Sequence, residues 1–352
     1  MGYSNFKDSL KMQIGLYTLS DLSSLGSDGQ KVDAHTRIKE TIAAAKLAEQ
    51  AGLDIFGVGE HHRLDFAVSV PSVVLAAIAA STSTIRLTSA VTVLSTADPV
   101  RVYEEFATLD LVSGGRAEII AGRGVFSEPF PLFGYDLQDY DALFDEKLAL
   151  FDLLNKSGRV TWKGRFRAPL NDAEIAPRAL QPTIPLWIAV GGSPDSAVRA
   201  GRLGLPMALA VLGGPYGRAA QLAALYRAVG REAGHAQTLR VAVNGHLHIA
   251  ETSQAARDDF YPHYSQYWVE STPSKSPRPR IPREDFNRSI TKDSGPFVGS
   301  PAEIIDKISL LHELTGMDRL VAQIDIGGMP FAKIAAMIEL LGDKVIPAIR
   351  KL

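Results

Sequence analysis

Short apolar runs rich in β-branched residues alternate with segments of helical periodicity along almost the whole chain. In the helical segments apolar residues recur at i, i+3, i+4 and i+7, as Ile38, Ile42, Ala45 and Ala48 do before Gly52 ends the first of them. The runs predict eight strands, at 12–17, 55–58, 85–94, 117–121, 186–190, 207–212, 239–249 and 320–326. The helical segments lie at 34–51, 72–80, 100–111, 142–154, 196–203, 219–233, 254–267, 302–314 and 331–341.

Strands that alternate with helices form parallel βαβ units, which close into a TIM barrel or a doubly wound sheet. The doubly wound alternative requires a GxGxxG turn after the first strand, but the sequence there reads TLSDLSSLGSDG. We therefore predict an α/β fold, a TIM (β/α)₈ barrel that occupies residues 1–352 as a single domain.

Two regions interrupt the alternation. Residues from about 159 to 179 indicate a β-hairpin insertion with its turn at Lys163 and Gly164. Residues from about 269 to 298 are rich in proline, serine and basic side chains and carry no periodicity. A long irregular run inside a barrel is typical of an active-site lid or a disordered segment.

Composition excludes several classes of function. The formal net charge is −2, which gives no electrostatic footprint for nucleic acid. The 352 residues include no cysteine, which excludes thiolate catalysis and cysteine-ligated metals and fits a reducing compartment. Neither a signal peptide nor an apolar run long enough to cross a membrane is present. We expect a cytoplasmic protein that handles small molecules.

Glu60, His61 and His62 directly follow the second predicted strand. Active sites of TIM barrels lie at the carboxyl ends of the strands, so this position favours chemistry. Imidazoles beside a carboxylate can transfer protons near neutral pH. Two other readings stay open at this point: a hydrogen-bonded turn of purely structural role, and a metal site that lacks an obvious third ligand.

An anion site is indicated after the fourth and fifth strands. Arg123 lies between Gly122 and Gly124, so a ligand could approach the backbone closely beside one guanidinium, although a plain turn with a surface arginine is the alternative. Gly191-Gly192-Ser193-Pro194-Asp195-Ser196 opens the next helix, with Ser193 as its N-cap. Free N–H groups and hydroxyls at a helix start bind phosphate readily, whereas an ordinary capped turn leaves the glycine pair unexplained.

Three further residues give weaker signals. His246 and His248 lie two apart in an apolar strand, hence on one face, and we interpret them as packed or surface residues. Asp325 ends the eighth strand, where it could reach the barrel mouth or cap a loop.

The chain resembles the bacterial luciferase-like, flavin-dependent monooxygenase family over nearly its whole length. The resemblance is carried by AAKLAEQAGLDIFGVGEHH (44–62), LTSAVTVLSTADPVRVYEEFATLDLVSGGR (87–116), GRGVF (122–126), GGSPDSAVRAGRLGLPMALA (191–210) and GSPAEIIDKI (299–308). It implies a TIM barrel that uses reduced FMN from a separate reductase, or in one branch the deazaflavin F420. With FMN, a flavin C4a-hydroperoxide formed with O₂ oxygenates a small organic substrate. Family barrels commonly form dimers, so we expect a homodimer.

The resemblance also implies roles for individual residues. His61 corresponds to the active-site acid/base, with Glu60 and His62 as supporting neighbours. Arg123, Ser193 and Ser196 correspond to ligands of the cofactor phosphate. Ala90 and Val91 correspond to a non-proline cis peptide under the flavin ring, and 269–298 corresponds to a mobile lid that keeps water out.

Two departures argue against light emission. Gly122 stands where light-emitting members have a reactive cysteine, and Gly192 stands where they have an acidic residue. Oxygenation by FMN is the main hypothesis. Hydride transfer with F420, whose acidic tail Arg278, Arg280 and Arg283 could bind, and a catalytically silent flavin-binding subunit are the alternatives.

Overall fold

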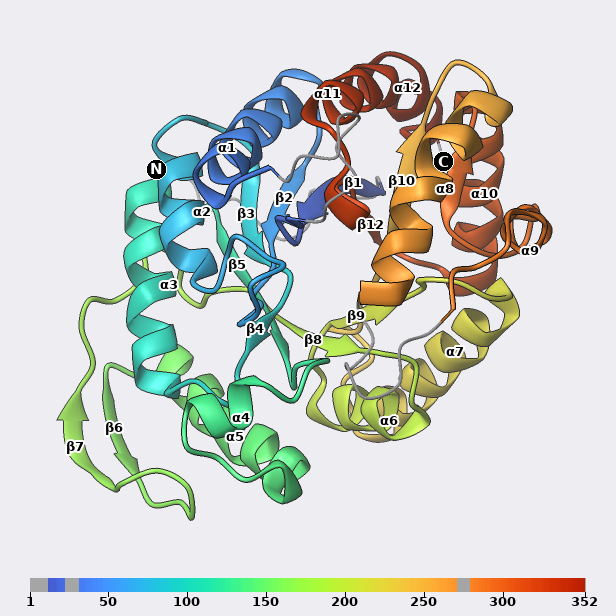
Figure 1. The fold of residues 1–352 in the computed structure, drawn as a ribbon. Coiled ribbons are helices and arrows are strands. Elements are labelled where there is room, and N and C mark those ends of the chain that lie inside the picture. Colours follow the sequence, from blue (N-terminus) through green and yellow to red (C-terminus); the bar gives the residue numbers. More distant parts are fainter. Residues whose placement is uncertain (1–11, 23–31, 271–278, 352) are drawn as a thin grey trace.

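Eight parallel strands form a closed barrel in the computed structural model, which describes residues 12–22, 32–270 and 279–351 (Figure 1). Each strand pairs in parallel with its neighbour, and the pairing of β12 with β1 closes the ring. Around the ring they are β1 (Gln13–Thr18), β2 (Ile55–Val58), β3 (Arg86–Ser89), β5 (Ala117–Gly122), β8 (Leu186–Val190), β9 (Met207–Ala210), β10 (Val241–Ile249) and β12 (Arg319–Gln323). The predicted TIM barrel is confirmed.

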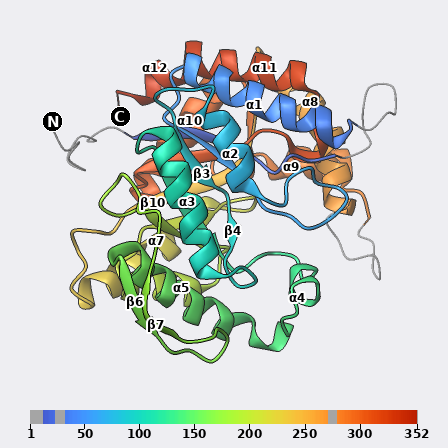
Figure 2. The ribbon, with the colours of Figure 1, turned by 90° about the vertical axis from the view of Figure 1, so that its left-hand side faces the viewer.

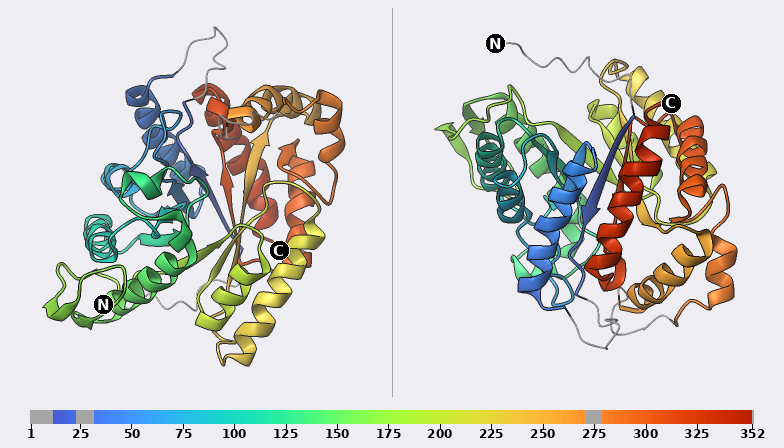
Figure 3. Two further views of the ribbon diagram at one scale, coloured as in Figure 1. Left: turned by 60° about the horizontal axis from the view of Figure 1, so that its bottom comes forward. Right: turned by 90° about the horizontal axis from the view of Figure 1, so that it is seen from above.

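Helices surround the barrel and bury its outer wall, with α1 and α11 packed side by side over the first strand (Figures 2 and 3). Their N-caps follow the sequence, since Asp33, Asp98 and Ser300 each accept a backbone N–H in the first turn. The helices are α1 (Ala34–Gln50), α2 (Pro71–Ala79), α3 (Pro99–Ser113), α4 (Pro129–Leu132), α5 (Tyr140–Lys156), α6 (Pro194–Leu203), α7 (Tyr216–Glu232), α8 (Ser253–Glu270), α9 (Arg283–Ser289), α10 (Pro301–Thr315), α11 (Phe331–Leu340) and α12 (Ile346–Ile349). No helix of the described residues is both long enough and apolar enough to cross a membrane.

Two predicted elements differ from the structure in detail. The third run is two strands rather than one, since β3 ends at Ser89 and β4 (Thr92–Val93) resumes after Ala90 and Val91. The hairpin insertion is confirmed as β6 (Arg159–Trp162) and β7 (Leu170–Glu174), and it projects from the barrel beside α5 (Figure 1). Its connection is longer than the predicted Lys163–Gly164 turn, because the strands are separated by residues 163–169.

The run at 269–298, predicted to lack regular structure, contains a helix and a short strand, so that part of the prediction is wrong. Residues 271–278, and Arg278 with them, lie outside the described residues, and the lid stays a prediction. Helix α9 buries Phe286, and β11 (Phe297–Gly299) adds to the end of β10. The fully buried Lys307 donates hydrogen bonds to the carbonyls of Thr291 and Ser294, at 2.6 and 2.8 Å. A buried ammonium that binds backbone carbonyls fixes this return segment to α10, which periodicity could not reveal.

Polar side chains fill the amino-terminal end of the barrel interior. Glu118 on β5 forms ion pairs with Arg86 and with Arg319, the latter at 2.7 Å. Arg319 also donates to Gln13 and stacks 4.2 Å from the centre of the Trp187 ring. Burial alone would raise the pKa of Glu118, but the two arginines hold it at about 2. This end of the barrel is closed by a buried charge network whose groups have partners.

Candidate functional site

His61 lies at the opposite, carboxyl end of the barrel, just past β2. Its ring stacks on Phe66, with 4.1 Å between ring centres, and meets the edge of Phe126 at 5.2 Å. Burial lowers the pKa of His61 to about 4, so the imidazole is neutral at physiological pH. Its Nδ1 is buried and has no hydrogen-bond partner among the described residues. A neutral imidazole with a free ring nitrogen is suited to accept or donate one hydrogen bond to a ligand.

The side chains of Glu60 and His62 contact each other, and Glu60 also accepts a backbone N–H near His61. Glu60 Oε1 lies 2.9 Å from His62 Nε2, while its Oε2 accepts the backbone N–H of Val93 at 2.9 Å. His62 packs its ring edge-to-face on Phe133. Within the described ranges no group of three or more His, Asp or Glu residues is arranged to hold a metal ion. These contacts give Glu60 and His62 a structural role beside His61, and their part in chemistry stays a prediction.

The link between β3 and β4 contains the expected cis peptide, between Ala90 and Val91. Gly122, at the end of the neighbouring strand β5, faces this link. A Cβ added at Gly122 would lie 2.6 Å from Cγ2 of Val91. Residue 122 must therefore lack a side chain while Val91 keeps its place, which gives a steric reason for glycine here.

Arg123, Ser193 and Ser196 meet at the start of α6, as the sequence predicted. Arg123 Nη2 donates to Ser196 Oγ at 2.8 Å, and the two serine hydroxyls lie 2.7 Å apart. Ser193 is the N-cap and accepts the backbone N–H of Ser196 at 3.3 Å. A guanidinium, two hydroxyls and a helix amino terminus thus converge, and all of them favour an anion.

Gly192, which the sequence indicated, and two residues that it did not, Arg218 and Asp141, surround this anion seat. Gly192 has a φ of 105°, a conformation that side chains avoid, which accounts for glycine in place of an acidic residue. Arg218 Nη2 donates to the carbonyl of Gly192 at 2.9 Å. Asp141 on α5 pairs with Arg123 at 2.5 Å and with Arg199 at 3.3 Å, so a carboxylate competes for the guanidinium.

The barrel mouth has an aromatic and polar lining that sequence reasoning missed. Tyr17, Phe66, Ala90, Phe126 and Tyr267 belong to one apolar cluster. Across the mouth, His246 Nδ1 lies 2.9 Å from Gln323 Oε1, and the His246 ring meets the Tyr267 ring edge-on at 6.1 Å. His246 and Gln323 lie in strands, where the alternation of strand faces could have indicated them. Phe66 and Phe126 lie in loops and Tyr267 in α8, where periodicity gives no such signal.

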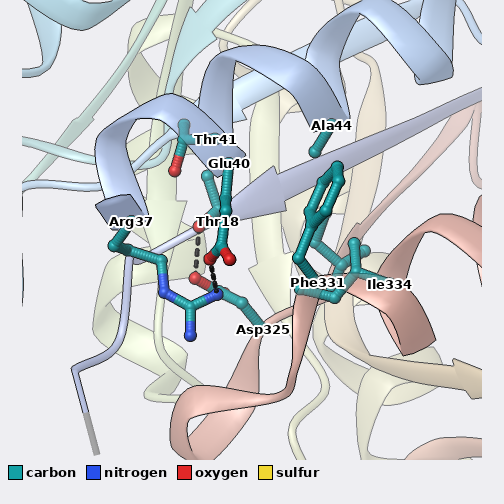
Figure 4. A pocket seen from close by; sticks show the side chains of 9 residues that line it. Thr18, Arg37, Glu40, Thr41, Ala44, Asp325, Phe331 and Ile334 are labelled. Carbon is teal, nitrogen blue, oxygen red and sulfur yellow. Dashed lines mark hydrogen bonds and ion pairs between the residues drawn. The ribbon is translucent and has the colours of Figure 1, made fainter. Parts of the chain in front are cut away.

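Asp325 caps the loop that follows β1 and so holds one rim of the mouth. It accepts hydrogen bonds from the Thr18 hydroxyl and from the N–H groups of Leu19 and Asp21. Behind it, a small pocket between α1 and α11 contains the Arg37–Glu40 ion pair (Figure 4). Of the two readings that the sequence left open, the loop cap agrees with these contacts.

Comparison with known proteins supports a single family. Residues 12–318 match the model of luciferase-like monooxygenases. The chain is 28% identical over 334 residues to the uncharacterized protein y4vJ of Sinorhizobium fredii, which covers 89% of this chain and 92% of that protein. It is 25% identical over 343 residues to the alkanal monooxygenase alpha chain of Photorhabdus laumondii, with 89% and 93% covered.

Solved structures share the fold. Monooxygenase RslO1 from Streptomyces bottropensis superposes with a TM-score of 0.83 at 24% identity, covering 96% of this chain and 99% of that one. The oxygenating constituent of 3,6-diketocamphane monooxygenase from Pseudomonas putida, in complex with FMN, gives 0.76 at 18% with the same coverage. A coenzyme F420 dependent tetrahydromethanopterin reductase from Methanopyrus kandleri gives 0.73 at 19%, again with 96% and 99% covered.

Proposed function

The chain belongs to the luciferase-like monooxygenase family, and from that premise we propose that it uses reduced FMN and O₂ to oxygenate a small organic substrate. The observation that carries the proposal is the anion seat of Arg123, Ser193 and Ser196, on the same end of the barrel as the neutral His61. A phosphate at the rim and a free imidazole beside the mouth are what a phosphorylated ring cofactor requires.

The residues present fit such a cofactor. Arg123, Ser193 and Ser196 would hold the phosphate, and Gly191 leaves open space beside it, because a Cβ there would meet nothing within 4 Å. Ala90, Val91 and the side-chain-free Gly122 would lie against the ring. Reduced flavin supplies the activation of O₂ when bound. His61, neutral at physiological pH, would accept or position a proton, while the aromatic lining excludes water.

FMN is favoured over F420 by what surrounds the candidate tail-binding arginines. Arg280 already donates to Gln266 Oε1 at 2.6 Å. Arg283 pairs with Asp258 and lies over the Tyr261 ring, 5.0 Å from its centre. Binding an acidic tail would have to break these contacts, whereas a phosphate monoester at the α6 seat competes with the single carboxylate of Asp141. The relative named alkanal monooxygenase alpha chain supports oxygenation rather than hydride transfer.

A titration separates the candidate functions. Purified protein is titrated without oxygen against reduced FMN, reduced riboflavin and reduced F420, then exposed to O₂ while absorbance and oxygen consumption are followed. We expect FMN to bind more tightly than riboflavin, and its complex to give, after O₂ is admitted, an absorbing species that outlasts the rapid autoxidation of free reduced flavin. Tight F420 binding without O₂ consumption would support hydride transfer instead. Binding without turnover of any kind, unchanged in His61→Ala, would support a silent flavin-binding subunit.

A flavin reductase and a second copy of the chain are the proposed partners. Helix α2 offers small residues for close packing, but Ala79 is buried against its own barrel while Ala77 and Ala80 are exposed beside Val73, which is 67% exposed. Light scattering of the purified protein tests the homodimer, and Val73→Glu is expected to shift a dimer toward monomer. A monomer in the unmodified protein would refute this part of the proposal.

A further inference from the structure

Three neutral polar side chains point from β10 and β12 into the barrel interior. Ala242 on β10 packs inside the barrel with Ile120 and Trp187. Side chains alternate along a strand, so Asn244 and His246, two and four residues further on, face the same interior. By the same alternation Gln323 faces inward two residues after Val321, which packs inside with Tyr17 and Ala90. The strand register sets His246 directly opposite Gln323.

We call Asn244, His246 and Gln323 the polar wall of the barrel interior. Two of its polar atoms, one on Gln323 and one on Asn244, have no hydrogen-bond partner among the described residues. Gln323 Oε1 accepts from His246 Nδ1, yet the Gln323 amide nitrogen has no partner in the described part of the chain. Asn244 Oδ1 also has none. His246 and Gln323 are 3% and 1% exposed, so neither side chain faces bulk solvent. Buried donors and acceptors without partners destabilise a fold, and a ligand that pairs them recovers that free energy.

The wall lies opposite β3 and β5, the strands beside which we propose that the cofactor ring binds. Around the eight-stranded ring, β10 and β12 are the seventh and eighth strands, and β3 and β5 are the third and fourth. Strands four places apart lie across a closed eight-stranded barrel from one another. A ring held between Ala90 and Gly122 would therefore leave the opposite wall, covered by Tyr264 and Tyr267 of α8, to the second reactant.

The wall is also uncharged. Burial lowers the pKa of His246 to about 4, so it is neutral at physiological pH. No lysine or arginine of the described residues donates a hydrogen bond to Asn244, His246 or Gln323. The nearest carboxylate in sequence, Asp325, is engaged by Thr18 and two backbone N–H groups. A sulfonate or carboxylate substrate would find no countercharge here.

We propose that Asn244, His246 and Gln323 form the substrate-recognition wall and select an uncharged substrate of the amide class, which offers a carbonyl acceptor and an N–H donor. Gln323 donates to the carbonyl, and Asn244 accepts from the N–H. The apolar body of the substrate packs among Tyr17, Phe126 and Tyr267. This inference rests on the proposed function, since it assigns the wall to the organic substrate that is oxygenated.

Three probes of one shape and different charge test it: benzamide, benzoate and benzylammonium. Their binding to the full-length protein, with and without FMN, is measured by ligand-observed NMR and calorimetry at pH 7.5. We expect benzamide to bind about tenfold more tightly than either ion, as a site built for neutral hydrogen bonds predicts. Equal or tighter binding of benzoate or benzylammonium overturns the proposal without any variant.

Variants then locate the site. Gln323→Leu and Asn244→Leu are each expected to weaken benzamide about tenfold, while Gln13→Leu, the same kind of loss at the other end of the barrel, leaves benzamide affinity unchanged. Circular dichroism and the unfolding midpoint identify variants that do not fold. Should Gln323→Leu fail to fold, the proposal is tested by the benzamide affinity of Asn244→Leu, at a half-buried position, and by the ranking of the three probes on the unmodified protein.

The flavin itself carries an imide edge, so it is the competing occupant of the wall. Competitive displacement of benzamide by FMN, together with weaker FMN binding in Gln323→Leu, would assign the wall to the cofactor and overturn the proposal. Failure of FMN to bind at all would refute the proposed function instead, and the ranking of the three probes would still test the wall.

Discussion

The two ends of the barrel interior bury polar groups in opposite ways. At the amino-terminal end, Glu118 is matched by Arg86 and Arg319, and both of its oxygens have partners. At the carboxyl end, His61 Nδ1 and the Gln323 amide nitrogen are buried and have no partner among residues 12–22, 32–270 and 279–351. A satisfied network contributes to a unique fold, whereas an unsatisfied one costs stability and is retained where a ligand completes it. Partners within the protein account for the polar groups at the amino-terminal end, whereas the unpaired atoms at the carboxyl end are those that a ligand bound in the mouth would complete.

The largest effect is expected from removing Glu118, the carboxylate of the buried charge network at the amino-terminal end. Glu118→Leu leaves two buried guanidinium groups without their carboxylate and is expected to lower the free energy of unfolding by about 3–5 kcal/mol. Urea titration measures this, and FMN affinity of the folded variant should stay unchanged. Glu104→Leu, which removes a partly exposed ion pair with Arg101 on α3, is the control and should cost less than about 1 kcal/mol. Equal losses in the two variants would contradict the distinction.

Next in size is the removal of the guanidinium from the anion seat. Arg123→Met is expected to weaken FMN about a hundredfold, because charge-assisted hydrogen bonds to a phosphate are lost. Riboflavin, which lacks the phosphate, should bind both proteins equally, and fluorescence quenching of each flavin measures the two affinities. A matching loss for riboflavin would mean that the substitution disturbs the barrel mouth and not the seat.

Acid should destabilise the two ends in different pH ranges. His61 is neutral in the folded protein, with a pKa of about 4 against an ordinary value of 6.5, so unfolding takes up a proton between these values and stability falls as pH drops. At pH 5 this amounts to about 2 kcal/mol relative to pH 7.5. Glu118, whose pKa is depressed, contributes stability above 4.5 that is lost only as pH falls toward 2.

Unfolding of His61→Asn at pH 7.5 and pH 5 tests this range. The variant should lose about 2 kcal/mol less than the unmodified protein between the two pH values. His35→Asn, at an exposed position in α1, is the control and should follow the unmodified protein. Parallel curves for all three proteins would show that His61 is not held neutral by burial.

The smallest effect concerns the competing carboxylate. Asp141→Asn releases Arg123 from its ion pair and removes a negative charge beside the seat, so FMN should bind about two- to fivefold more tightly. The gain should shrink as salt rises from 0.05 to roughly 0.5 M, since the pair is exposed. Weaker binding instead would mean that Asp141 orients Arg123 for the phosphate.

Sequence periodicity sufficed for the barrel because every strand is flanked by helices and buried on both faces. The runs at 55–58 and 186–190 coincide with β2 and β8. Periodicity did not indicate the break after Ser89, since IRLTSAVTVL reads as one β-branched run; only the family resemblance pointed to Ala90 and Val91. Helix α9 was missed because its seven residues, REDFNRS, bury one aromatic side chain and have no stripe.

The seat at α6 was predictable because capping chemistry is local. Ser193 and Ser196 lie within one helical turn; Ser196 accepts from Arg123, and the Ser193 hydroxyl lies 2.7 Å from that of Ser196. Asn244 and Gln323 were not predictable, since their meaning depends on which face of a strand turns inward and on partners far along the chain. Asp141 was missed for the same reason, as it comes from a helix that follows β5 by many residues.

The contact between Gly122 and Val91 also constrains how this protein could evolve. A side chain at 122 meets Val91 Cγ2 at 2.6 Å, so a change from glycine to cysteine is blocked while the valine remains. The order of substitutions therefore matters: residue 91 must become smaller before residue 122 can acquire a thiol. A mutational library that varies both positions should recover cysteine at 122 mainly in combination with alanine or glycine at 91, a dependence invisible to any single-site scan.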